Sequence, residues 1–119
     1  MSGIYALEKQ LSEGKIQIAE RDKVLELRKH PLFQELIEKQ FCQVECSRYT
    51  HASGDPALTA AQRADALNIA QAAGHLRRWL NVVIQLGNQA ESQREGIEEA
   101  LLEARQEEEQ ADTQQQGGD

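Results

Sequence analysis

A stripe of small and apolar residues, spaced by alternating steps of three and four, runs through the stretch from residue 59 to residue 104. The members of the stripe are Ala66, Ile69, Ala73, Leu76, Leu80, Val83, Gly87, Ala90, Arg94, Ile97, Leu101 and Ala104. This spacing keeps the side chains on one narrow face of a helix, as in a coiled-coil seam. At about 1.5 Å per residue the helix would be roughly 70 Å long, more than a domain of this size can cover. We therefore predict that part of the seam binds a partner helix. The predicted partner-binding residues are Leu76, Leu80, Val83, Gly87, Ala90, Ile97 and Leu101.

Two further helices are predicted before this stretch. Residues 2–29 carry a stripe of Ile4, Leu7, Leu11, Ile18 and Leu25, with Gly14 and Arg21 at its two weak positions. Residues 31–49 carry an apolar face of Phe33, Ile37, Phe41 and Val44, which should form the thickest part of the core. No run of β-branched residues with a period of two predicts a strand. We expect an all-α fold, a helical hairpin or small bundle with one long, coiled-coil-like C-terminal helix.

Turn and capping residues set the expected boundaries. Pro31 disfavours helix at the residue before it and suits the first turn of a new helix. Residues 51–57 contain Ser, Gly, Asp and Pro together, which is typical of a turn. Thr59 and Gln62 then match a capping box, which marks the start of the long helix. The predicted helical domain is 1–106, with helices at about 2–29, 31–49 and 59–106, followed by a disordered acidic and Gln-rich tail at 107–119.

The charge of the chain is concentrated at one end. Residues 95–119 contain nine acidic residues and one basic residue, whereas the other 94 residues carry a net charge of +1. An acidic end repels the phosphates of duplex DNA, so we do not expect direct nucleic-acid binding there. It suits solubility or docking on a basic surface. We also expect no membrane span, because no segment approaches 18 apolar residues, and no signal peptide in residues 1–9.

The candidate chemical sites are few. Cys42 and Cys46, with His51 and either His30 or His75, could contribute to a metal site, but a tight cysteine pair on a turn is the usual arrangement. We therefore interpret the cysteines as small apolar residues of a core helix and expect reduced thiols and no metal.

A compact basic and aromatic cluster is formed by His75, Arg77, Arg78 and Trp79. It could contact phosphates or a partner's carboxylates, or it could be a solvated helical face. The acidic set of Glu98, Glu99 and Glu103 is interpreted as a solvated surface. We find no catalytic motif and no phosphate-binding loop, so we expect neither an enzyme nor a cofactor.

Several short motifs occur in a distinctive order over about half the chain. They are HPLFQELIEKQF with Pro31 and Phe33, a D-P-x-L turn at Asp55–Leu58, an L-R-x-W stretch at Leu76–Trp79, and a G-x-x-A step at Gly87–Ala90 before the acidic end. In this order the chain resembles small helical proteins encoded in the structural gene clusters of tailed bacteriophages. It departs from them at CQVEC (42–46), where a more charged segment is expected, so a shared contact on that face is in doubt.

The resemblance implies a non-enzymatic role in the virion or its assembly. The chain would be a scaffold-like, head-completion or minor virion component, located in the host cytoplasm, in the virion, or in both. Its partners would be copies of itself or phage structural proteins. The alternative is a small acidic inhibitor or adaptor that uses its acidic helix as a charge mimic to bind a host protein.

Overall fold

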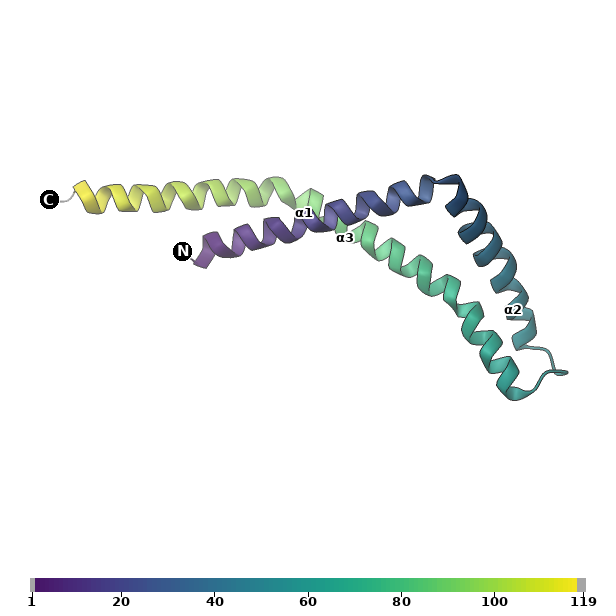
Figure 1. Ribbon diagram of the computed structural model, residues 1–119. Helices are drawn as coiled ribbons and strands as arrows, with labels where there is room; N and C mark the ends of the chain where they lie inside the picture. Colours follow the sequence, from purple (N-terminus) through teal and green to yellow (C-terminus); the bar gives the residue numbers. More distant parts are fainter. Residues whose placement is uncertain (1, 118–119) are drawn as a thin grey trace. The chain divides into compact units, whose positions relative to one another are not determined.

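The computed structural model describes residues 2–117, and these are helical except near His30 and residues 54–59 (Figure 1). Helix α1 spans Ser2–Lys29, a π-helical segment η1 spans Phe33–Glu45, α2 spans Cys46–Ser53, and α3 spans Ala60–Gly117. Among these residues there is no strand. The predicted all-α class and the long C-terminal helix are confirmed. None of the helices in the described part of the chain is both long and apolar enough to cross a membrane.

The chain divides into two compact units. The first contains Met1–Asp22 and Gln85–Asp119, and the second contains Lys23–Ile84. Helices α1 and α3 contribute to both units, whereas η1 and α2 belong to the second alone.

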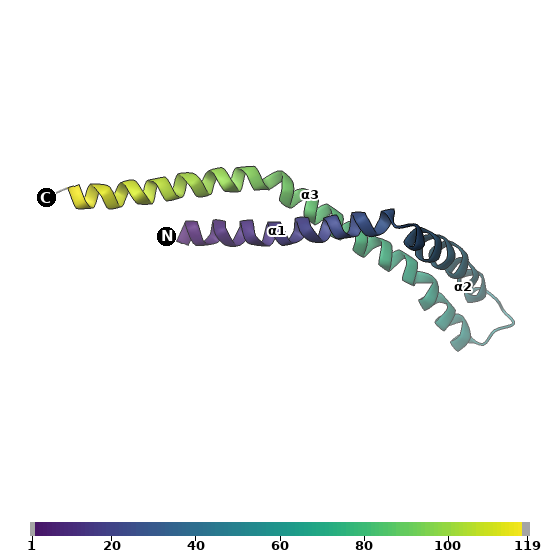
Figure 2. The ribbon, with the colours of Figure 1, turned by 45° about the horizontal axis from the view of Figure 1, so that its top comes forward.

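The first unit is an antiparallel pair of helices, which Figures 1 and 2 show side by side. Glu8 of α1 accepts a hydrogen bond from Arg105 of α3 at 2.8 Å, while Arg21, further along α1, bonds Glu91, earlier in α3. The stripe predicted along residues 2–29 is half-buried at Ile4, Leu7, Leu11 and Ile18. The facing stripe of α3 contributes the buried residues Gly87, Ala90 and Leu101. Small side chains at the centre of this pair allow the two backbones to approach closely.

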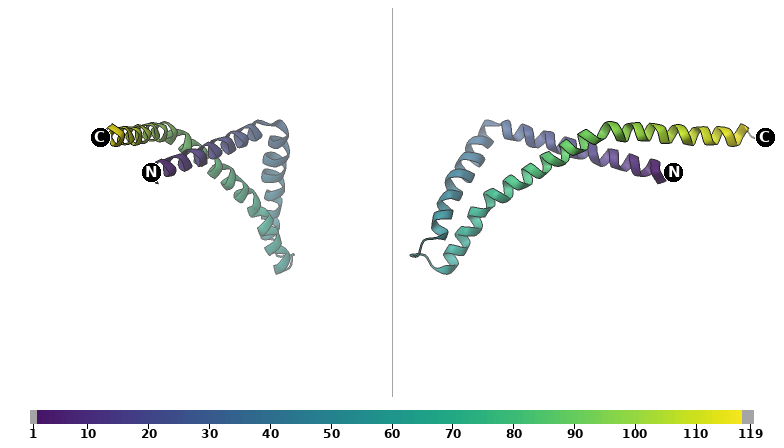
Figure 3. Two further views of the ribbon diagram at one scale, coloured as in Figure 1. Left: turned by 60° about the vertical axis from the view of Figure 1, so that its left-hand side comes forward. Right: turned by 180° about the vertical axis from the view of Figure 1, so that it is seen from behind.

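In the second unit, η1 and α2 lead from α1 to the turn before α3 (Figure 3). The buried apolar residues of this unit are Val24, Cys46, Ala66, Ala73 and Leu80. None of the residues of η1 is buried, so the expectation that its phenylalanines form the thickest part of the core is wrong. Three of these five residues belong to α3, and two of the three are alanines, whose short side chains are easily covered.

The π-helical geometry of η1 explains why Val44 does not lie on the apolar face that was predicted for residues 31–49. A π-helix bonds each residue to one five positions away, and such segments are usually short. Here the Cys46 N–H donates to the carbonyl of Phe41 at the end of a 13-residue segment. Residues Phe33, Ile37 and Cys42 share one groove, at steps of four and five, whereas Val44 is 48% exposed.

A similar shift occurs at the end of α1. Leu25 was predicted to lie on the stripe, but it is exposed, and its neighbour Val24 is buried instead. Val24 lies three residues after Arg21, so one step of four in the stripe is replaced by a step of three. The period of the helix permits either residue to follow Arg21, and the local packing selects Val24.

The turn residues act as predicted. The carboxylate of Asp55 accepts a hydrogen bond from the Ala57 N–H at 2.9 Å. The Thr59 hydroxyl accepts from the Gln62 N–H at 3.1 Å, and the Gln62 side-chain oxygen accepts from the Thr59 N–H at 3.0 Å. These reciprocal bonds form the predicted capping box and satisfy two N–H groups at the start of α3.

The end of the last helix differs from the expectation. We predicted a helix that ends at residue 106 and a disordered tail at 107–119, but α3 continues to Gly117. Residues 105–114 are all exposed, so packing does not account for this extension. Glutamate and glutamine have high intrinsic helix propensity, and this segment is rich in both. Residues 118–119 lie outside the described part.

Deletion of residues 112–119 is expected to leave the melting temperature nearly unchanged. The described part of this segment packs against no other element, because its side chains up to Gln114 are exposed. Thermal unfolding followed by circular dichroism tests this expectation. A decrease of more than about 5 °C, roughly 1 kcal/mol for a domain of this size, would show that the segment makes stabilising contacts.

Candidate protein-interaction surface

The seam residues predicted to bind a partner are covered by the chain itself. Leu80, Gly87, Ala90 and Leu101 are buried, and Leu76, Val83 and Ile97 are half-buried. The chain reverses direction and packs its own helices against the stripe, in the first unit through α1. These seven residues are therefore buried or half-buried within the chain, and a more exposed part of the molecule is the better candidate for a partner contact.

The most specific contact inside the first unit joins Arg21 to Gly87. These residues are weak members of the two predicted stripes, a charged residue on α1 and a glycine on α3. A Cβ atom placed on Gly87 would lie within 2.9 Å of both Cγ and Cδ of Arg21, and closer still to its Cβ. The absence of a side chain at Gly87 therefore creates the space that Arg21 occupies. The charged residue in the α1 stripe and the glycine in the α3 stripe therefore fit each other.

Polar groups hold the end of the Arg21 side chain. Its guanidinium donates to Glu91, to Asn88 at 3.0 Å and to Asp22 at 3.0 Å. The hydrogen bond to Glu91, followed by that to Asp22, raises the pKa of Arg21 above its usual value. The Arg21 side chain is only 11% exposed, whereas Glu91 and Asp22 remain largely accessible to solvent. The cluster thus fixes the register of two helices and offers no open position for a ligand.

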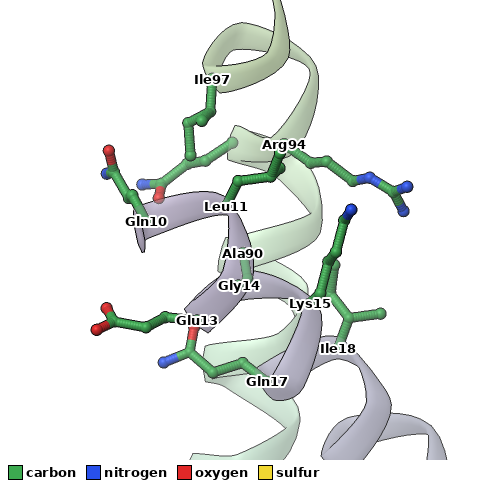
Figure 4. A pocket seen from close by; sticks show the side chains of 11 residues that line it. Gln10, Leu11, Glu13, Gly14, Lys15, Gln17, Ile18, Ala90, Arg94 and Ile97 are labelled. Atoms are coloured by element: carbon green, nitrogen blue, oxygen red, sulfur yellow. The ribbon is translucent and has the colours of Figure 1, made fainter. Parts of the chain in front are cut away.

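The second irregularity of the α1 stripe, Gly14, also faces a small residue. A Cβ on Gly14 would lie 3.6 Å from the Cβ of Ala90, an ordinary van der Waals distance. Figure 4 shows Gly14 and Ala90 where the helices meet, with Leu11 and Ile97 nearby. The adjacent pocket has a volume of about 80 Å³, room for only a few waters. It is a packing defect beside the glycine, too small for an organic cofactor.

A larger groove lies in the second unit, between the end of α1, η1 and α3. Its volume is about 240 Å³. The apolar lining residues are Phe33, Ile37, Cys42, Leu76 and Leu80, and the polar ones are Arg28, Glu38, Arg77 and Asn81. Arg28 donates to Asn81 at 2.9 Å and so links α1 to α3 along the groove. With one carboxylate, one thiol and no histidine in its lining, the groove offers no acid–base pair of histidine and carboxylate.

The two cysteines have different surroundings. Cys46 is buried, and its thiol lies 3.7 Å from the Ile69 carbonyl oxygen, whereas half-buried Cys42 lines the groove. Both are free thiols. His51 is exposed on α2. Within the described residues, no group of three or more His, Cys, Asp or Glu side chains is arranged to hold a metal ion.

The chain is therefore expected to fold identically with and without a chelator. Cys46 already occupies an apolar core position and needs no metal to explain its burial. Far-ultraviolet circular dichroism before and after addition of EDTA measures this directly. A loss of helical signal that zinc restores would assign Cys42, Cys46 and His51 to a metal site.

The residues of the basic and aromatic cluster predicted from the sequence lie on two different faces of α3. Arg77 lines the groove. His75, Arg78 and Trp79 lie on another face of α3 together with Val82, which the sequence analysis did not include. Spacings of three, four and seven place these four residues next to one another on the helix surface. We call this set, His75, Arg78, Trp79 and Val82, the Trp79 face.

Every residue of the Trp79 face is exposed, and Trp79 has 60% of its surface accessible. Among the described residues, neither Arg78 nor His75 makes an ion pair or side-chain hydrogen bond. Tryptophan and arginine are the residue types that most often dominate binding energy at protein interfaces. The Trp79 face is the best candidate for an interaction surface.

No protein-family model, curated protein or solved structure matches this chain.

Proposed function

We propose that this chain is a non-enzymatic protein that acts by helix–helix association in the virion, or in the assembly pathway, of a tailed bacteriophage. The observation that carries the associative part is the Trp79 face, which exposes the chain's one tryptophan beside Arg78. The phage setting is carried by the resemblance of the motif order alone. As a scaffold-like, head-completion or minor virion component, the chain would contact copies of itself or other phage structural proteins.

The distribution of exposed apolar side chains supports the second unit as the binding half. Thirteen large apolar residues of the described chain are exposed, and nine of them belong to this unit. The nine residues are Leu25, Leu27, Leu32, Leu36, Val44, Leu67, Ile69, Trp79 and Val82. Exposed apolar groups gathered in one region are typical of interaction sites, whereas scattered ones are ordinary. The first unit exposes only Tyr5, Ile16, Leu86 and Leu102.

Mass spectrometry of purified particles and of assembly intermediates tests the phage setting. We expect the wild-type chain in at least one of the two, in multiple copies per particle, because assembly proteins repeat around a symmetric shell or ring. The Trp79→Ala variant is expected to be lost from that fraction while remaining soluble and helical. If the wild-type chain is absent from both particles and intermediates, the proposed setting is wrong.

A second candidate, an acidic inhibitor or adaptor of a host protein, is favoured by one specific observation. The last part of α3 presents Glu103, Glu107, Glu108, Glu109 and Asp112, all exposed on a continuous helix. Such a surface could imitate a charged ligand of a basic partner. Stoichiometry separates the two proposals, because an inhibitor forms a complex of fixed ratio with one target and has no reason to accumulate in particles.

A further inference from the structure

A second exposed face on α3 repeats the spacing of the Trp79 face with opposite charge. Glu95, Glu98, Glu99 and Leu102 are all exposed, and they occur at the same intervals as His75, Arg78, Trp79 and Val82. We call this second set the Leu102 face. Leu102 is 58% exposed and is surrounded on this face by carboxylates. Glu98 bonds Arg94 at 3.0 Å on the surface, while Glu95 and Glu99 have no ion pair among the described residues.

Equal spacing allows the two faces to match residue by residue if two α3 helices lie parallel. A shift of 20 residues sets His75 opposite Glu95, Arg78 opposite Glu98, and Val82 opposite Leu102. The same shift sets Trp79 opposite Glu99, where the indole would pack against the aliphatic part of the glutamate side chain. An antiparallel arrangement would set Val82 opposite Glu95 and His75 opposite Leu102, which loses both the apolar contact and one charge pair. Parallel alignment with an axial shift of roughly 30 Å is therefore the favoured geometry.

We propose that the Trp79 face of one copy binds the Leu102 face of a second copy. The charges of the two regions are complementary, since residues 23–84 carry eight basic and six acidic residues, whereas residues 95–119 carry one basic and nine acidic. The contact joins two different surfaces, so in a pair one copy keeps an unused Leu102 face and the other copy keeps an unused Trp79 face. Association of this type propagates into open chains or closes into a ring. The proposal deepens the associative function above by naming the partner surface.

Charge reversal tests the pairing. Sedimentation velocity on the wild-type chain is expected to show self-association that weakens as salt rises from 0.05 to 0.5 M, roughly the range over which exposed charges become screened. Arg78→Glu alone and Glu98→Arg/Glu99→Arg alone are each expected to raise the dissociation constant by about tenfold or more. Trp79→Ala is expected to raise it roughly 30-fold, the effect of losing an interface anchor.

Mixing the two charge-reversed chains gives the decisive result. Each variant repels itself, but in the mixture both kinds of contact become attractive, so association is expected to recover to within about threefold of wild type. That margin is small beside the tenfold effect of opposing like charges. Lys39→Glu and Glu20→Arg, exposed charges away from both faces, are the controls and should associate like wild type. Circular dichroism confirms that each variant is folded.

Three outcomes overturn the proposal. The first is a mixture that associates no better than its components, which indicates a contact of one face with itself. The second is a pair of reversed variants that associate like wild type, in which case association uses another surface and the proposed function stands. The third is a wild-type chain that remains monomeric at all accessible concentrations. The particle measurement above still decides the phage setting in that case, so the two proposals fail independently.

Discussion

The Leu80→Asp variant is expected to lose the folded structure of residues 23–84. Leu80 is 3% exposed and lies at the side of the groove formed with Phe33 and Ile37. Burial of a leucine side chain contributes about 1.5–3 kcal/mol. An aspartate at the same position would lose its hydration, which costs several kcal/mol more, although Arg28 and Arg77 line the same groove. Together these terms reach the stability of a typical small domain.

Urea unfolding followed by circular dichroism measures the effect, with Gln85→Asp as the matched control. Gln85 is exposed on the same helix, so this variant introduces the same charge and should change the free energy of unfolding by less than about 0.5 kcal/mol. Equal stability of the two variants would show that Leu80 is not a core residue. The intrinsic fluorescence of Trp79 adds a signal from the unit that contains Leu80.

The Gly87→Ala variant is expected to be less stable than wild type by about 1–3 kcal/mol, the usual cost of overpacking. The informative result is the sign of the change in the free energy of unfolding. Alanine in place of glycine inside a helix ordinarily stabilises it by about 1 kcal/mol. At Gly87 the new methyl group would collide with Arg21, including its Cβ atom, which cannot move without the α1 backbone. The collision therefore outweighs the gain in helix propensity.

Two controls separate this collision from propensity. Gly96→Ala lies on the same helix with nothing within 4 Å of the new Cβ, so it should stabilise the chain. In the Gly87→Ala background, Arg21→Gly should recover more stability than Arg21→Ala, because alanine keeps the colliding Cβ. A double-mutant cycle built from urea unfolding gives the coupling energy. Gly87→Ala as stable as Gly96→Ala would mean that the two helices do not approach each other as described.

The Arg21 and Gly87 pair also explains how an irregular stripe can specify one register. A uniform apolar seam would permit the two helices of the first unit to slide by a turn with little loss. Here a slide would place Arg21 against a residue with a side chain and would separate it from Glu91 and Asn88. Polar contacts between paired helices can select one register, at some cost in stability.

The all-α class and the start of the last helix were predictable because their causes are local. The long α3 follows from a period that is visible in the residues themselves, and its first turn follows from the reciprocal bonds of Thr59 and Gln62. The identity of the buried positions was also largely predictable. The buried residues of α3 are Ala66, Ala73, Leu80, Gly87, Ala90 and Leu101, and each belongs to the predicted stripe.

The partner of that stripe was not predictable, because an apolar stripe specifies only that something must cover it. The period alone is compatible with a second chain or with the same chain folded back, and the structure has the chain cover itself. The π-helical η1 was likewise hidden, since the sequence pattern of residues 33–45 fits either helical period within so short a stretch. The exposure of Trp79 was left open by its neighbours, because a tryptophan that follows two arginines and precedes a leucine suits the rim of an interface and the edge of a core equally.

By itself, the sequence determined the helical class, how α3 begins, the stripe that holds its buried residues and where the charge is concentrated, because each depends on neighbours within one or two turns. It did not determine that α3 continues to Gly117, or that Ile69 and Arg94 of the stripe are exposed. Only the tertiary structure decided that Arg21 faces Gly87, that Val24 replaces Leu25 in the core, and that Arg77 separates from the Trp79 face. These arrangements depend on contacts between residues far apart in the chain. Many such pairings satisfy the same local pattern, and the fit of side chains across the interface selects one of them.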